Sequence, residues 1–235
     1  MQLPFFFINP SLSAESLIWL DEVNSRHIVQ VLRMKTGQKI NLTDGLGNLL
    51  TAEISEGHKK HCQVIILERS RVERNGRNLC MAVSLLKNTA RFEWFLEKAT
   101  ELGVSRIIPL LCERTEKQKF RLDRMKGILI SAMLQSQQCW LPELPEPIKF
   151  ESMEGWDINE GEKYIAHCMP EYRSSLSKLP AVQDGLIAIG PEGDFSQEEI
   201  QQAIDKNFIP VSLGENRLRT ETAAMVAATI FLLKA

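Results

Sequence analysis

The segment IGPEGDFSQEEI, residues 189–200, places two glycines and two carboxylates between an apolar run and a predicted helix. Such turns often bind phosphate, because the free N–H groups at a helix N-terminus attract anions. Here Glu192 and Asp194 would repel a phosphate, and the chain contains neither G-x-G-x-x-G nor G-x-x-x-x-G-K-[ST]. The turn therefore favours a ligand that is neutral, cationic or bound through backbone groups. An ordinary strand-to-helix connection is the alternative.

A second group of polar residues lies in the C-terminal stretch VSLGENRLRTETAAMVAATIFLLKA. A predicted strand ends at Gly214, the following loop carries Arg217 and Arg219, and Thr220 is predicted to cap a helix whose first turn holds Glu221. An arginine can stabilise negative charge on a reacting carbonyl, and a carboxylate can accept a proton. The alternatives are an ion pair for Arg219 and helix-end electrostatics for Glu221.

The elements that must position these loops alternate between strand and helix across residues 79–235. Strand-like runs are CMAVSLLK, VSRIIPLLC, YIAHC, GLIAIG and PVSLG, and helices are predicted at residues 90–103, 122–138, 196–206 and 220–235. This alternation predicts an α/β domain with a parallel sheet covered on both faces. Ligands in such sheets bind outside the carboxyl ends of strands, so both loops are expected to share one site. Ser196 and Glu199 fit a capping box.

Residues 1–72 have a different pattern and predict a small β-rich domain, followed by the polar linker VERNGRN. INLTDGLGNLLTAEI predicts a hairpin, and QVIILERSRV predicts a further strand. SRHIVQVLRMKTG predicts a short helix with Ile28, Val31 and Leu32 on one buried face.

The last predicted helix has no charged residue from Thr222 to Leu233. A helix that is apolar on every face must be covered on every face. Either a second subunit or the interior of one large domain meets this requirement, and the sequence favours neither. Ala223, Ala224, Ala227 and Ala228 would let another backbone approach closely.

Charge is distributed unequally along the chain, although its net value is only −2. Residues 1–126 carry 20 Lys/Arg against 14 Asp/Glu, a net of +6, and residues 127–235 carry 8 against 16, a net of −8. The densest basic cluster, RTEKQKFRLDRMK, spans residues 114–126. A basic half favours contact with a polyanion, whereas a single cluster is often only a solvated helix face.

Other patterns exclude several classes of protein. The five cysteines form no C-x-x-C pair and are typical of reduced thiols in a cytoplasmic protein. His58-x-x-His61 lacks further ligands at useful spacing, so we expect a solvated loop and no metal site. No signal peptide and no apolar run long enough to cross a membrane is present.

The two C-terminal motifs, GLIAIGPEGDFSQEEI and VSLGENRLRTETAA, together resemble the end of the 16S ribosomal RNA uridine-N3 methyltransferases, the RNA methyltransferase E type of the SPOUT superfamily. The resemblance covers most of the chain. RHIVQVLRMKTGQKINLTDGLGNLLTAEI, residues 26–54, resembles that family's N-terminal β-barrel domain. RFEWFLEKATELGV, residues 91–104, resembles the first helix of its catalytic domain.

This resemblance implies a C-terminal SPOUT domain, residues 79–235, with a parallel sheet and a trefoil knot, and an N-terminal PUA-like β-barrel, residues 1–72, that holds RNA. It implies S-adenosylmethionine as the cofactor, no metal, a homodimer in the cytoplasm, and methylation of N3 of one uridine in the 16S RNA of the small ribosomal subunit. We expect Arg219 to stabilise the uracil anion and Glu221 to be the nearest candidate base.

The resemblance also assigns binding residues. The expected cofactor-binding residues are Ile189, Gly190, Pro191, Glu192, Gly193, Leu213, Gly214, Leu218, Thr220, Thr222 and Ala223. The expected RNA-binding residues are Arg26, His27, Arg33 and Lys35, together with the basic cluster at residues 114–126.

The chain departs from the family's usual pattern at three places. Asp194 stands where the family usually has a second glycine, and Arg26-His27 stands where it usually has a His-His pair. In the middle helix, Gln137, Gln138 and Cys139 replace the usual residues.

Three alternatives account for part of the same features. A non-catalytic RNA-binding module would need only the basic half of the chain. A SPOUT methyltransferase with another target, such as transfer RNA or large-subunit RNA, would share the site. A small-molecule α/β enzyme that uses a nucleotide is disfavoured, since the phosphate-binding loops are absent.

Overall fold

The computed structural model describes residues 3–74, 76–116, 119–156, 161–169 and 174–233. Contacts between its residues divide the chain into two units. The N-terminal unit comprises Met1–Arg74 with Met133–Leu141, and the C-terminal unit comprises Asn75–Ala132 with Pro142–Ala235.

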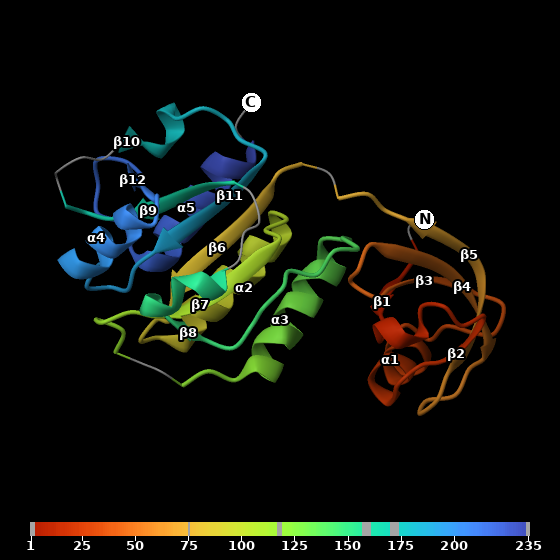
Figure 1. The fold of residues 1–235 in the computed structure, drawn as a ribbon. Helices are drawn as coiled ribbons and strands as arrows, with labels where there is room; N and C mark the ends of the chain where they lie inside the picture. The colour runs from red at the N-terminus through yellow and green to blue at the C-terminus, as the bar shows by residue number, and fades with distance from the viewer. Residues whose placement is uncertain (1–2, 75, 117–118, 157–160, 170–173, 234–235) are drawn as a thin grey trace. The chain divides into compact units, whose positions relative to one another are not determined.

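The N-terminal unit is a curled, five-stranded sheet with the order β1-β3-β4-β5-β2 (Figure 1). Its strands are β1 (Phe5–Phe7), β2 (Leu17–Trp19), β3 (Lys39–Thr43), β4 (Asn48–Glu56) and β5 (Gln63–Arg71). β3 and β4 are antiparallel, and Gly45 and Gly47 between them take φ values of +74° and +91°, which favour glycine. The predicted hairpin is therefore confirmed.

The helix that the sequence predicts near residue 26 begins earlier and loses its regular spacing. It consists of α1 (Glu22–Arg26) and a π-helical turn, η2 (His27–Val31). A π-turn inserts an extra residue, so the side chains after it rotate away from the original face. Ile28 is buried, but Val31 and Leu32 are 66% and 41% exposed. The prediction of a shared buried face was wrong for Val31 and Leu32.

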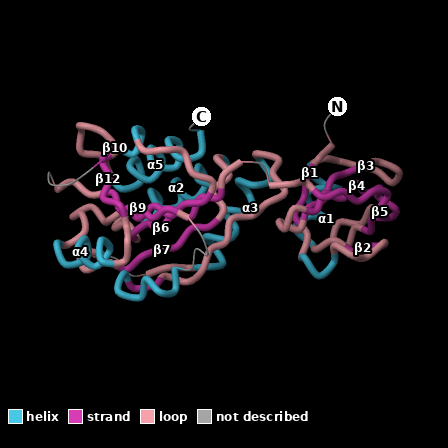
Figure 2. The backbone as a smooth tube through the Cα atoms, turned by 45° about the horizontal axis from the view of Figure 1, so that its top comes forward, coloured by secondary structure: helices cyan, strands magenta, loops and turns pink. Residues whose placement is uncertain are grey.

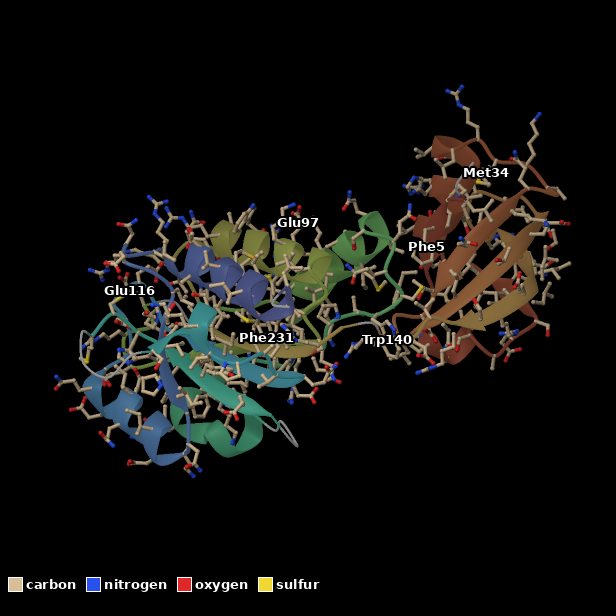
Figure 3. All side chains as sticks on the ribbon, turned by 90° about the horizontal axis from the view of Figure 1, so that it is seen from above. Phe5, Met34, Glu97, Glu116, Trp140 and Phe231 are labelled. Carbon is tan, nitrogen blue, oxygen red and sulfur yellow. The ribbon has the colours of Figure 1, made fainter. Side chains whose placement is uncertain are left out.

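The segment Met133–Leu141 joins the N-terminal unit through backbone pairing and one tryptophan. The Leu141 N–H donates to the Gly45 carbonyl at 2.9 Å, and the Gly47 N–H donates to the Cys139 carbonyl at 2.8 Å. The indole of Trp140, labelled in Figure 3, lies so close to Gly47 that a Cβ there would be 2.4 Å from its Cζ2. The predicted second domain, residues 79–235, includes this segment, because helical periodicity and prolines show nothing of its contacts.

The described part of the C-terminal unit contains a seven-stranded sheet with the order β10-β12-β9-β11-β6-β7-β8. The strands are β6 (Asn78–Ser84), β7 (Arg106–Leu111), β8 (Ile148–Lys149), β9 (Glu162–Ala166), β10 (Ser174–Ser175), β11 (Asp184–Ile189) and β12 (Ile209–Ser212). Every neighbouring pair runs parallel. The predicted parallel sheet is thus confirmed.

Helices cover both faces of this sheet, as Figure 2 shows: α2 and α5 lie on one face and α4 on the other. The helices are α2 (Thr89–Glu101), α3 (Leu122–Gln135), α4 (Gln197–Asp205) and α5 (Thr220–Leu233), with 3-10 turns η3 (Phe150–Trp156) and η4 (Leu176–Lys178). Phe231 of α5 lies against Gly185 of β11, where a Cβ would be 2.4 Å from the phenyl ring (Figure 3). On the α4 face, Ile200 and Ala203 pack into the core beside Ala82.

The order of the last strands has the arrangement that a trefoil knot requires. β12 pairs with β9 on one side and with β10 on the other. The connection from β9 to β11 carries β10, so it reaches the outer edge of β12 before it returns. α5 then contacts η4 of that same connection and also β6 and β11. This path supports the knotted SPOUT-type fold that the resemblance implies, in place of the simple connections that most sheets use.

Candidate functional site

A pocket of about 280 Å³ lies beside the carboxyl ends of β9 and β11, and its wall includes the start of α5. A smaller cavity of about 70 Å³ adjoins it at the end of β12. Both are lined by Ala166, Cys168, Leu218 and Ala223, so the two cavities belong to one site. This is the edge at which parallel sheets bind ligands.

Most of the residues that the sequence analysis assigned to the cofactor line this site. Ile189, Gly190, Pro191, Glu192, Leu218, Arg219, Thr220 and Ala223 line the larger cavity. Leu213, Gly214, Leu218 and Ala223 line the smaller one. Gly193, Thr222 and Glu221 line neither cavity. The fold thus brings the two C-terminal motifs together at one site, and three of their predicted residues lie outside the cavity lining.

Close packing explains why glycine is needed in the turn after β11. A Cβ on Gly190 would be 3.0 Å from the Phe195 backbone nitrogen and 3.1 Å from its ring. At Gly193, the carbonyl accepts a hydrogen bond from Arg114 Nη1 at 2.8 Å. The helix that follows begins with the predicted capping box of Ser196 and Glu199, which is confirmed. The turn is therefore fixed from both of its ends.

Asp194 occupies a backbone conformation that suits glycine, with φ of +65°. Aspartate tolerates this region better than most residues, because its short side chain bonds to nearby backbone groups. Its Oδ2 accepts from the Cys168 N–H at 2.7 Å, and its Oδ1 accepts from the Phe195 N–H at 2.9 Å. In this chain the carboxylate thus ties the loop after β9 to the turn after β11.

The start of α5 holds Arg219 firmly by its backbone. The Ala223 N–H donates to the Arg219 carbonyl at 2.7 Å, so Arg219 takes the cap position and Thr220 is the first helical residue. The prediction that Thr220 is the cap was wrong by one residue. The Arg219 side chain is exposed and lines the larger cavity. None of the ion pairs found among the described residues includes it.

Glu221 has a different environment from Arg219. It is 8% exposed, and its Oε1 lies 3.5 Å from Nε of Arg91 in the first turn of α2. Glu192 lines the larger cavity, and its Oε1 accepts from the Lys87 N–H at 3.2 Å. The pocket wall therefore combines two carboxylate residues, Glu192 and Asp194, with two arginines, Arg217 and Arg219.

The thiols near the sheet differ in burial. Burial raises the pKa of Cys80 and of Cys112 to about 12, so both stay neutral at physiological pH. Cys168 is exposed and lines both cavities.

The predicted RNA-binding residues of the N-terminal unit lie on its surface around α1 and η2. Arg26, His27, Arg33 and Lys35 are all exposed. Arg26 forms an exposed ion pair with Glu22 at 2.9 Å, and such pairs contribute little to stability.

The basic cluster at residues 114–126 is partly engaged within the C-terminal unit. Arg114 donates to the glycine turn, and Arg124 forms a two-point pair with Glu93, with N–O distances of 2.6 and 3.0 Å. Lys117 of this cluster lies outside the described residues. Part of the cluster therefore has a structural role that its composition did not reveal.

The residues at and directly after the end of β9 also contribute to the site, although the sequence did not predict this. Ala166, His167 and Cys168 line the site, but no motif marks them. The available signal was positional: YIAHC was a predicted strand, and its carboxyl end had to meet the same edge of the sheet. Asn216 and Arg217 of the last loop were also missed as lining residues.

Two further properties concern the described residues alone. None of their helices has the length and apolar character needed to span a membrane. They contain no group of three or more His, Cys, Asp or Glu side chains arranged to hold a metal ion.

Comparison with known proteins agrees with the geometry. The family model for an RNA methyltransferase domain matches residues 73–232 of the sequence, and the family model for an RNA methyltransferase PUA domain matches residues 20–67. A ribosomal RNA small subunit methyltransferase E from Synechocystis is 32% identical over 94% of this chain and 74% of its own length. One from Rickettsia conorii is 30% identical over 94% of this chain and 91% of its own length.

Solved structures give the same result. A probable rRNA methyltransferase from Porphyromonas gingivalis has a TM-score of 0.89 at 35% identity, covering 97% of this chain and 96% of its own. A ribosomal RNA small subunit methyltransferase E from Neisseria gonorrhoeae, bound to S-adenosyl methionine, has a TM-score of 0.85 at 29% identity, with the same coverage. These matches span both units, and the chain therefore belongs to the ribosomal RNA small subunit methyltransferase E family.

Proposed function

We propose that this protein uses S-adenosylmethionine to methylate N3 of a specific uridine in the 16S RNA of the small ribosomal subunit. The observation that carries the proposal is the single site that the loops after β9, β11 and β12 form with the start of α5. Family membership supports the cofactor and the RNA substrate.

The residues of the site fit S-adenosylmethionine. Small side chains and backbone at Ala166, Gly190 and Gly214 leave room for close approach, as a bent nucleoside and amino acid would need. A wall with the acidic residues Glu192 and Asp194 and the arginines Arg217 and Arg219 suits a ligand that carries both a cationic sulfonium and a carboxylate, as S-adenosylmethionine does. When bound, the cofactor supplies an electrophilic methyl group.

The remaining chemistry falls to the chain's own side chains. Uridine N3–H is a weak acid, so the nitrogen must lose its proton before or during attack. Arg219 lines the pocket, and we assign it to the negative charge that spreads onto the uracil carbonyl oxygens. Glu221 was the nearest candidate base in the sequence; because its carboxylate lies beside Arg91 and lines neither cavity, we assign it to positioning α5.

The N-terminal unit is proposed to hold the RNA. Its exposed residues Arg26, His27, Arg33 and Lys35 form a basic surface that can contact phosphates without reading sequence. Base identity is then read where the target uridine enters the pocket.

We also propose a homodimer. The face of α5 formed by Thr222, Val226, Thr229 and Leu233 is uncharged and at least partly exposed, and Leu233 is 73% exposed. Ala224, Ala227 and Ala228 are buried within their own unit, so they are not the surface for a second copy that the sequence analysis considered. Covering the outer face of α5 would remove an uncharged helical surface from water.

Calorimetric titration with S-adenosylmethionine, followed by mapping of methylated uridines on small subunits, tests the function. We expect cofactor binding and one new N3-methyl mark in 16S RNA. RNA binding without cofactor binding would support the non-catalytic alternative. A mark on transfer or large-subunit RNA would instead support another SPOUT activity.

A further inference from the structure

Three aromatic rings follow one another on the surface of the N-terminal unit, outside the residues assigned above. The rings of Trp19 and His61 have centroids 5.9 Å apart at an interplanar angle of 56°. His61 and His58 are closer, with centroids 3.8 Å apart at 35°. Trp19 is the last residue of β2, and the histidines belong to the loop before β5. We call these three residues the ring ladder.

Local structure fixes the ring ladder at the surface. β2 pairs with β5 so that Trp19 lies opposite Gln63, while the preceding residue, Ile18, is 1% exposed and faces the core. Because side chains alternate along a strand, Trp19 must point outward. Cys62 is also buried, and its N–H donates to Ser25 Oγ at 2.8 Å, which anchors the loop directly after His61.

The histidine loop has its own bond. The Lys60 N–H donates to His58 Nδ1 at 3.3 Å, so this nitrogen is the acceptor in the neutral ring. Lys59 and Lys60 are exposed, and the ion pairs among the described residues include neither of them. In the sequence, both lysines lie between the two histidines of the ring ladder.

The ring ladder is not needed by the core of its unit. Trp19 is 48% exposed, and the buried cluster of the N-terminal unit contains none of the three rings. A metal site is not supported either, since the described residues bring no third His, Cys, Asp or Glu ligand to the two histidines. Trp19 shares the outward face of β2 and β5 with Leu17 and its strand partner Ile65, which are 46% and 44% exposed, and a contiguous exposed apolar patch of this kind marks a binding surface.

We propose that the ring ladder is a stacking platform for unpaired bases of single-stranded RNA, with Lys59 and Lys60 at the adjoining phosphates. Single-stranded RNA is held by aromatic side chains that stack on bases and by cations along its backbone. A protein partner fits less well, because the cores of protein interfaces are depleted of lysine. The inference rests on the proposed function, in which the substrate is RNA, and adds a second contact region beyond Arg26 and Arg33.

The test uses the full chain and a fluorescein-labelled twelve-nucleotide oligouridine, alone and annealed to oligoadenosine. Trp19→Ala should weaken binding of the single strand by at least about five-fold, the scale of one lost stacked base. Trp19→Phe should recover most of the affinity, because it keeps a ring. Binding of the duplex, whose bases are already paired, should change much less.

Leu67→Ala is the matched control. Leu67 lies on β5 and is 49% exposed, so its removal takes away a similar apolar surface without a ring. We expect wild-type RNA affinity for this variant. Equal losses in Trp19→Ala and Leu67→Ala would overturn the proposal, as would a loss of duplex binding as large as the loss of single-strand binding.

Failure of this inference can be told apart from failure of the proposed function. If Trp19→Ala keeps wild-type affinity for oligouridine while the enzyme still methylates small subunits, only the ring ladder is refuted. If that variant also sediments less well with small subunits, the surface binds a ribosomal protein and the proposal is again wrong. If the wild-type chain binds neither RNA nor S-adenosylmethionine, both proposals fall.

Discussion

Arg91 Nε lies 3.5 Å from Glu221 Oε1, and this ion pair joins the first turn of α2 to the first turn of α5. The glutamate side chain is 10% exposed and the arginine side chain 38%. Water is largely excluded from the carboxylate, which strengthens its attraction to the cation. Since Arg219 caps α5, the pair restrains the backbone from which that arginine reaches the pocket.

The first prediction concerns this pair. Glu221→Gln and Arg91→Gln should each lower both the melting temperature and the turnover, because either change loosens the start of α5. The double variant should be less damaged than the two single effects added together, with a coupling of at least about 0.5 kcal/mol in urea unfolding. The opposite outcome would be loss of turnover in Glu221→Gln, with wild-type stability in both variants and wild-type turnover in Arg91→Gln. That result would identify Glu221 as the base.

The second prediction is that the turn after β11 cannot accommodate a side chain at Gly190 without a loss of cofactor binding. Gly190→Ala should weaken S-adenosylmethionine binding by about ten-fold or more, since the added Cβ would displace the Phe195 backbone that shapes the pocket. Gly127→Ala in α3 is the control, because a Cβ there meets nothing within 4 Å. That variant should bind normally and gain up to about 1 kcal/mol in stability. Equal affinities in the two variants would remove this turn from the site.

Substitution of two arginines from the same basic cluster should have different effects on cofactor affinity. Arg114→Ala removes the donor to the Gly193 carbonyl and should raise the Kd for S-adenosylmethionine several-fold. Arg124→Ala removes only an exposed pair with Glu93 and should leave that Kd unchanged. Each should weaken RNA binding slightly and reduce its dependence on salt. Calorimetry that gave the same cofactor affinity for both variants would show that Arg114 does not support the turn.

Assembly gives a fourth prediction. Thr229→Glu places a charge on the outer, uncharged face of α5 and should shift the protein from dimer to monomer in light scattering. Gln202→Glu adds the same charge on the exposed face of α4 and should leave the dimer intact. A native monomer for the wild-type chain would contradict the proposal directly.

Much of this architecture follows from local patterns in the sequence. Strand and helix periods predicted the parallel sheet, and the Ser196 capping box predicted the start of α4 to within one residue. What periodicity cannot show is contact at long range. Nothing local marks Trp140 as the partner of Gly47, or the segment after β9 as part of the pocket wall.

Composition likewise left the role of individual charges open. Arg114 and Arg124 lie in one basic run, yet only Arg114 reaches the glycine turn. The burial of Ala227 on α5 depends on which face of the helix meets the sheet, and the sequence does not show this. The exposure of Val31 follows from the π-turn η2, which no glycine or proline marks in the sequence.

The last prediction concerns Arg219, for which the sequence left two interpretations open. In one, the arginine stabilises the uracil anion; in the other, it pairs with Glu192, Glu215 or Glu221 and braces the loop. The ion pairs of the described residues speak against the second interpretation, and the first remains our proposal. Glu221 faces Arg91, Glu192 accepts the Lys87 N–H, and the ion pairs among the described residues do not include Arg219.

Arg219→Ala should therefore reduce turnover on small subunits by about 100-fold or more at saturating cofactor, the usual cost of removing one oxyanion donor. The Kd for S-adenosylmethionine and the melting temperature should barely change, because the Arg219 carbonyl still accepts the Ala223 N–H. Arg219→Lys keeps the charge but loses the planar fork, so its turnover should recover only in part. Arg217→Ala is the matched control, since its Nη2 bonds to the Glu192 carbonyl at 3.3 Å and its loss should affect cofactor binding more than turnover. A parallel fall of stability, cofactor affinity and turnover in Arg219→Ala would instead assign the residue to bracing the loop.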